Sequence, residues 1–160
     1  ALLTLDCVEG IEFHSDLVLE GDEAFYKEVD RVVAKSEEII RSGKTAVCYT
    51  NRKLLVVEND SKEDALVRSV KISDGVQSLV GRLHVTPAFV IAKGGITSSD
   101  VGTKALKVKR ANVMGQIRPG IPVWQTGEES TFPQTPYVIF PGNVGDVETL
   151  KEAVEILMEK

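Results

Sequence analysis

The sequence predicts an α/β domain of three layers, with a mostly parallel sheet covered by helices on both faces. Short apolar, β-branched runs alternate with amphipathic helical segments along the chain. The run 88–92 is short and fully apolar, which is typical of a buried parallel strand. The chain has 160 residues, a length that suits one domain, and we expect that domain to cover 1–160. A more antiparallel patch is expected near 108–124.

The first third of the chain predicts two strands around one long helix. A strand is expected near 2–6, followed by a polar loop that contains His14 and Asp16. Apolar residues recur at helical spacing from about Asp22 to Arg41, so this helix buries one face. Gly43 ends it, because glycine readily adopts the left-handed conformation at a helix end. The β-branched segment 45–50 predicts a strand, and 54–57 a second short one.

The remaining segments continue the alternation. Ser61, with Asp64 three residues later, is a weak capping signal for a helix that reaches Leu83, although Gly75 weakens its middle. After the strand 88–92 we expect a helix over 97–106, strands over 108–117 and 121–124 around a Pro-Gly turn, a strand over 137–140 and a final helix from about Asp146.

Composition excludes several classes of protein. The formal net charge of −5 argues against a broad nucleic-acid-binding face, which needs clustered positive charge. Four basic residues between 104 and 110 are interpreted as a solvated helix end. No apolar stretch approaches the roughly 20 residues of a membrane span. Cys7 and Cys48 lie in apolar runs and are expected to be buried free thiols, so a cytoplasmic location is predicted.

The loop from Gly94 to Ser99 is the main candidate for a binding site. It follows the strand 88–92, and ligands of parallel sheets collect beyond the carboxyl ends of strands. Gly94 and Gly95 let the backbone turn and approach a ligand closely, and Thr97, Ser98 or Ser99 would cap the next helix. Free amides at a helix start attract anions. We therefore expect phosphate groups here, while a plain strand-to-helix turn explains the pattern about equally well.

A second glycine-containing turn covers 141–146, after the strand 137–140. Gly142 and Gly145 again allow close approach of the backbone, and Asp146 is a suitable helix cap. Alone, this turn is more often structural. Because both turns lie where strands end, each supports a binding role for the other.

Other apparent motifs are rejected. Gly43-Lys44-Thr45 resembles the end of a P-loop, but it follows a helix and precedes a strand, and the required earlier glycine is Glu38. His14 and His84 are isolated from other ligand-type residues, so no metal site is predicted.

Three motifs together resemble a known family. Gly94-Gly95-Ile96-Thr97-Ser98, the segment from Val113 to Pro122 and Gly142-Asn143-Val144-Gly145-Asp146 occur in this order in the C-terminal nucleotide-binding domain of the four-carbon acid sugar kinases. The resemblance covers about 92–158, whereas the first ninety residues match only in the order of their elements. It implies an ATP-dependent kinase that phosphorylates a hydroxyl of a sugar acid such as threonate, erythronate or an oxo-tetronate.

The resemblance also implies site residues and partners. Gly94, Gly95, Ile96, Thr97, Ser98 and Gly142 would contact ATP, and Mg²⁺ is expected with the nucleotide although no protein ligand is assigned. The sugar acid and the catalytic base would belong to an N-terminal domain that this chain lacks. The isolated chain is therefore expected to bind ATP or ADP without catalysing the reaction.

Two departures from the family pattern leave an alternative open. The family usually has an acidic residue where Ile96 stands and a lysine where Phe140 stands. The alternative is a non-catalytic ligand-binding or assembly module of the same fold. The sequence does not fix the oligomeric state, although an incomplete sheet would leave an edge to cover, as in a homo-oligomer.

Overall fold

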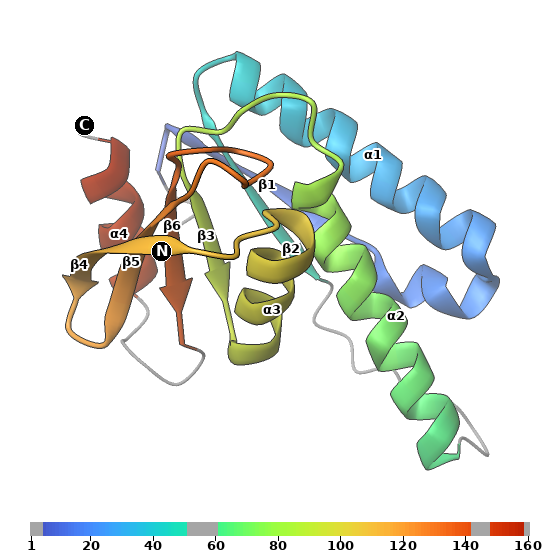
Figure 1. Cartoon of the computed structure of the whole chain (residues 1–160). Coiled ribbons are helices and arrows are strands. Elements are labelled where there is room, and N and C mark those ends of the chain that lie inside the picture. The colour runs from blue at the N-terminus through green and yellow to red at the C-terminus, as the bar shows by residue number, and fades with distance from the viewer. Residues whose placement is uncertain (1–4, 51–60, 142–147, 159–160) are drawn as a thin grey trace.

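A computed structural model describes residues 5–50, 61–141 and 148–158 (Figure 1). The strands are β1 (Val8–Phe13), β2 (Thr45–Thr50), β3 (Val90–Lys93), β4 (Ala111–Arg118), β5 (Ile121–Thr126) and β6 (Pro136–Phe140). The helices are α1 (Asp22–Arg41), α2 (Lys62–Gly81), α3 (Gly95–Asp100) and α4 (Thr149–Met158). A 3₁₀ turn covers Ser15–Glu20, and a π-helical turn over Val101–Ala105 continues α3. No helix in these ranges is long and apolar enough to cross a membrane.

The described strands form two sheets. β1 and β2 pair in parallel. The second sheet has the order β3-β6-β5-β4, in which β3 and β6 are parallel while β5 pairs antiparallel with both β6 and β4. The α/β class and the antiparallel patch near 108–124 are therefore confirmed.

Helices cover both faces of the second sheet (Figure 1). Side chains alternate along a strand, so Tyr137 and Ile139 of β6 join the core beneath α3 and the π-helical turn, with Leu106 and Phe132. Val138 and Phe140 point to the opposite face, where Leu150 and Leu157 of α4 pack against them. The outer strand is tied to the same helix by an ion pair between Arg118 and Glu152, with 2.9 Å between Nε and Oε2.

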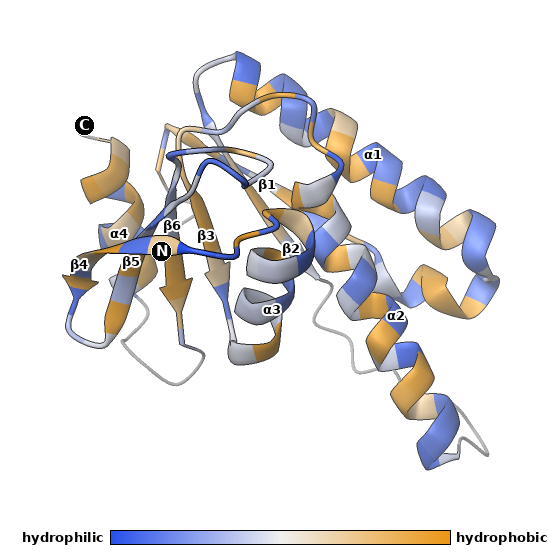
Figure 2. Ribbon diagram, in the orientation of Figure 1, coloured by the Kyte–Doolittle hydropathy of each residue, from blue (hydrophilic) through white to orange (hydrophobic). Residues whose placement is uncertain are grey.

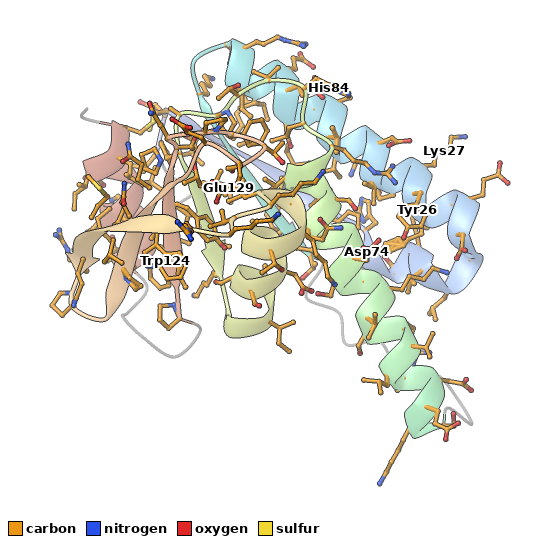
Figure 3. The ribbon with its side chains drawn as sticks, viewed as in Figure 1. Tyr26, Lys27, Asp74, His84, Trp124 and Glu129 are labelled. Carbon is orange, nitrogen blue, oxygen red and sulfur yellow. The ribbon has the colours of Figure 1, made fainter. Side chains whose placement is uncertain are left out.

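The two long helices pack on each other and on the first sheet. Their core contains Ile11 and Phe13 of β1, several apolar residues of α1, and Leu79 of α2. Tyr26 donates its hydroxyl to Asp74 across the two helices at 2.9 Å, and Figure 3 shows these side chains facing one another. This hydrogen bond raises the pKa of Tyr26, because it stabilises the neutral phenol beside a carboxylate.

Local sequence signals located α1 and the start of α2 correctly. Figure 2 shows apolar and polar residues alternating around α1, as its spacing predicted. Gly43 follows α1 with a φ of +88°, a conformation that favours glycine. The side chain of Ser61 caps α2 by accepting the amide of Asp64 at 3.0 Å.

Five local predictions were wrong or fall outside the described residues. The first described strand lies at Val8–Phe13, where a polar loop was expected, and it is paired along its whole length with β2. The helix predicted for 97–106 begins at Gly95. Cys7 and Cys48 are free, but Cys7 is only half-buried and Cys48 is exposed. The strand expected at 54–57 and most of the one at 2–6 lie outside the described residues.

Gly75 allows the close contact of α1 and α2. A methyl group at this position would lie 2.5 Å from the Cζ atom of Phe25, whose side chain is fully buried. Although alanine favours helix more than glycine does, we expect Gly75→Ala to lower the free energy of unfolding by about 1–3 kcal/mol. Urea unfolding measures this effect. Ser69→Ala, on an exposed part of α2, is the control and should not destabilise the chain; equal stability of both variants would contradict the packing argument.

The Glu129 carboxylate (Figure 3) accepts the backbone amides of Arg110 and Lys109 at 2.8 and 3.0 Å. These hydrogen bonds lower the pKa of Glu129, since they favour its charged form. The stabilisation is complete above the ordinary glutamate pKa of about 4.3 and is lost as the pH falls through the lower pKa of the folded chain. Glu129→Gln should therefore flatten the acid limb of the stability–pH curve, measured by thermal unfolding. An unchanged acid limb would contradict this role.

Candidate functional site

The loop after β3 begins with a backbone turn that requires glycine. Gly94 has a φ of +101°, which places it in the left-handed region. Its amide donates to the carbonyl of Phe140 at 2.8 Å, one step beyond the paired ends of β3 and β6. The loop is thereby fixed at the edge where two parallel strands end.

Three amides follow this turn at the start of α3. The first backbone hydrogen bond of the helix runs from the amide of Ser98 to the carbonyl of Gly94, at 2.9 Å. The amides of Gly95, Ile96 and Thr97 precede it and donate to no acceptor among the residues that the structure describes. Gly95 and Ile96 are exposed and Thr97 is half-buried, so these donors lie at the surface. Their position favours a negatively charged ligand.

Side chains at the loop differ in their exposure and contacts. Ile96 is 77% exposed, so it lies at the rim of the loop. A Cβ atom at Gly95 would meet nothing within 4 Å, which leaves open space above the backbone. The predicted side-chain cap is wrong, because Gly94 occupies the cap position and Thr97, Ser98 and Ser99 lie within the helix.

Ser98 anchors the helix from below. Its hydroxyl donates to the carbonyl of Ala92 in β3 at 3.0 Å, and its side chain is buried. The structure therefore brings Gly94, Gly95, Ile96 and Thr97 together at the surface, with Ser98 beneath them. Gly142, the remaining predicted contact, lies outside the described residues. That these residues contact a ligand remains a prediction.

Tyr137 is a supporting residue that sequence reasoning missed. Its side chain is buried, and its hydroxyl donates to the carbonyl of Ser98 at 2.5 Å. Burial raises the pKa of Tyr137, so the hydroxyl stays protonated as a donor. Its ring lies beside Gly102 of the π-helical turn. A tyrosine in a buried strand requires a hydrogen-bond partner, and this was the signal available in the sequence.

A cation lies at the same edge of the sheet. Lys93 is the last residue of β3 and pairs in register with Phe140 of β6. Its Nζ atom lies 5.5 Å from the centroid of the Phe140 ring, which is within the range of a cation–π contact. Lys93 is exposed, whereas Phe140 is buried.

An open cleft of about 540 Å³ lies elsewhere, lined mainly by α1 and by Arg82 and His84. Its charged groups already pair with one another. Nη1 of Arg82 lies 3.0 Å from Oδ1 of Asp30. The Glu37 carboxylate lies 3.3 Å from Nη2 of Arg41 and 3.3 Å from Nδ1 of His84. The described residues contain no group of three metal-ligating side chains. We therefore place the candidate site at the loop, where backbone donors are available.

Comparisons with known proteins agree with the fold. A domain of unknown function (DUF1537) from Bordetella bronchiseptica, solved with bound citrate, resembles the chain with 19% sequence identity and a TM-score of 0.67. A Haemophilus influenzae protein, also described as DUF1537, has 17% sequence identity and a TM-score of 0.68. A putative tRNA synthase from Salmonella typhimurium has 16% sequence identity and a TM-score of 0.67. The matches cover 96%, 92% and 93% of this chain. They cover 35%, 34% and 34% of the others, so the chain spans about a third of their length.

A search of curated proteins found no match to the sequence. A family model described as the nucleotide-binding C-terminal domain matches residues 2–150. This match extends well beyond the three motifs and confirms the resemblance that they indicated. The chain therefore belongs to the family of nucleotide-binding C-terminal domains.

Proposed function

We propose that the chain is the ATP-binding portion of a cytoplasmic kinase that phosphorylates a hydroxyl of a four-carbon sugar acid. The observation that carries this proposal is the set of surface amides at Gly95, Ile96 and Thr97, in a domain of a nucleotide-binding family. Backbone amides at a helix start are suited to phosphate oxygens. Because the donors belong to the backbone, isoleucine at position 96 does not remove them.

Phosphoryl transfer depends mainly on positioning the reactants and on neutralising charge. This domain would position ATP. The loop offers Mg²⁺ no carboxylate: Ile96 is apolar, and Asp100 already accepts the hydroxyl of Ser73 at 2.6 Å. Magnesium commonly binds through nucleotide phosphates with few protein ligands. We therefore expect ATP to carry its Mg²⁺, and the sugar acid and catalytic base to be bound by another domain.

The second candidate is a non-catalytic ligand-binding or assembly module of the same fold. The exposure of Ile96, at 77%, favours it, because an apolar side chain at the rim would suit a protein or apolar ligand better than phosphate. Nucleotide binding separates the two candidates, since the module would bind neither ADP nor ATP.

Self-association is a further part of the proposal. The Bordetella protein is described as a domain-swapped dimer. In this chain the first half of α2 carries exposed Leu66, Val67 and Val70, and Figure 2 shows apolar residues on this projecting part of the helix. Exposed apolar side chains that cluster in this way are typical of contact surfaces. A homo-oligomer of the full protein would cover them.

Direct binding tests the main proposal. We expect isothermal titration calorimetry to detect ADP and ATP binding, with ATP affinity changed by Mg²⁺, and we expect no turnover of threonate or erythronate by this chain. Absence of heat and of a thermal shift with either nucleotide would favour the module. Kinase activity of the chain alone would contradict the assignment of the sugar acid and the catalytic base to another domain.

Gly95→Ala tests whether the ligand approaches the loop amides. The added methyl group meets no protein atom within 4 Å, so stability should change by less than about 0.5 kcal/mol. The methyl group would occupy the space that a phosphate needs, and we expect the Kd for ADP to rise about tenfold or more. Calorimetry and thermal unfolding measure the two effects.

Gly43→Ala is the matched control for this variant. Gly43 has a φ of +88° at the end of α1, so alanine there should lower stability without changing the Kd for ADP. If Gly95→Ala binds ADP as tightly as the unaltered chain, the nucleotide does not lie over these amides.

A further inference from the structure

Among the residues that the structure describes, no carboxylate pairs with Lys93 at the edge of the sheet. Among the described lysines, residues 44, 71, 104 and 151 each form an ion pair with an acidic side chain. Lys93 forms none within the described residues, and its Nζ atom instead lies over the ring of Phe140. An aromatic face attracts an ammonium group without cancelling its charge. The charge therefore remains available to an anion.

The aromatic ring beneath this ammonium is fixed by buried structure. Phe140 is 1% exposed and belongs to the core with Ile121 and Val138, so its ring cannot move away. Lys93 follows Ile91 by two residues and therefore points to the same face of the sheet, which is the α4 face. The helix that carries the surface amides lies on the other face. A phosphate over this edge would have amides on one side and the ammonium on the other.

We infer that Lys93 binds the phosphate groups of the nucleotide and supplies the positive charge of the site. This inference rests on the proposed function and adds a side chain to a site made otherwise of backbone. The chain has a net charge of −5, so a polyanionic nucleotide needs a local cation to offset repulsion. A lysine acts on phosphate as a point charge, without the fixed geometry of arginine.

Phe140 has a defined part in this arrangement. As the residue that pairs in register with Lys93, it occupies the neighbouring strand end and holds the lysine side chain by the contact of its ring with Nζ. Phe140 is therefore a positioning residue, while Lys93 makes the contact with the ligand.

Three variants test the inference by calorimetry with ADP. Lys93→Gln should raise the Kd about tenfold to a hundredfold, the range for loss of a hydrogen bond to a charged group. It should also weaken the dependence of the Kd on salt concentration, because one ion contact is lost. Lys93→Arg keeps the charge and should bind ADP within about threefold of the unaltered chain. Lys35→Gln, on an exposed position of α1, changes the net charge equally and should leave the Kd unchanged.

The possible failures are distinguishable. If the unaltered chain binds ADP and Lys93→Gln binds it equally well, the role of Lys93 is wrong while the proposed function stands. If Lys35→Gln weakens binding as much as Lys93→Gln, the effect comes from net charge and the assignment of Lys93 is overturned. If the unaltered chain binds no ADP, both the proposed function and the role of Lys93 are wrong.

Discussion

The parallel pairing of β3 with β6 is the constraint on which the candidate site depends. Because the strands run in the same direction, both end at one edge of the sheet. The hydrogen bond from the amide of Gly94 to the carbonyl of Phe140 extends that pairing into the loop. The next three amides therefore start from a fixed point, and Ser98 and Tyr137 hold the helix that carries them. A site made mainly of backbone donors requires this rigidity, because backbone amides cannot adjust to a ligand as a long side chain can.

The two adjacent glycines of the loop serve different purposes. Gly94 is required for its conformation, since its φ of +101° is strained for other residues. Gly95 has ordinary helical geometry and is required, on our proposal, for the space above it. Substitutions at the two positions should therefore separate an effect on the fold from an effect on the ligand. The exposed side chain of Ile96, next to them, makes the rim of the loop apolar but leaves the backbone amides in place.

Charge is distributed unevenly over the molecule. The open cleft beside α1 contains the cations Arg41 and Arg82, but carboxylates of the same cleft pair with them. Lys93 has an aromatic ring as its neighbour instead. The charged groups of the cleft thus pair with one another, whereas the strand edge, among the described residues, retains backbone donors and an ammonium without a carboxylate partner. This contrast in unpaired donors and charge locates the candidate site at the strand edge.

The sequence by itself determined the α/β class, the extent of α1, the cap of α2 at Ser61 and the glycine-containing loop at Gly94. Each depends on neighbours within a few residues, so a local pattern contains the necessary information. The three ordered motifs also indicated the family, which the match over residues 2–150 confirmed. Glycine at position 94 could be interpreted alone, because few other residues adopt its conformation.

Only the tertiary structure decided which distant residues meet. The strand Val8–Phe13 was missed because its stability comes from pairing with β2, more than thirty residues later. The hydroxyl of Tyr137 reaches the carbonyl of Ser98 across 39 positions, and Lys93 meets Phe140 only because β3 and β6 are neighbours. Such contacts depend on strand order and register, which a local pattern does not contain.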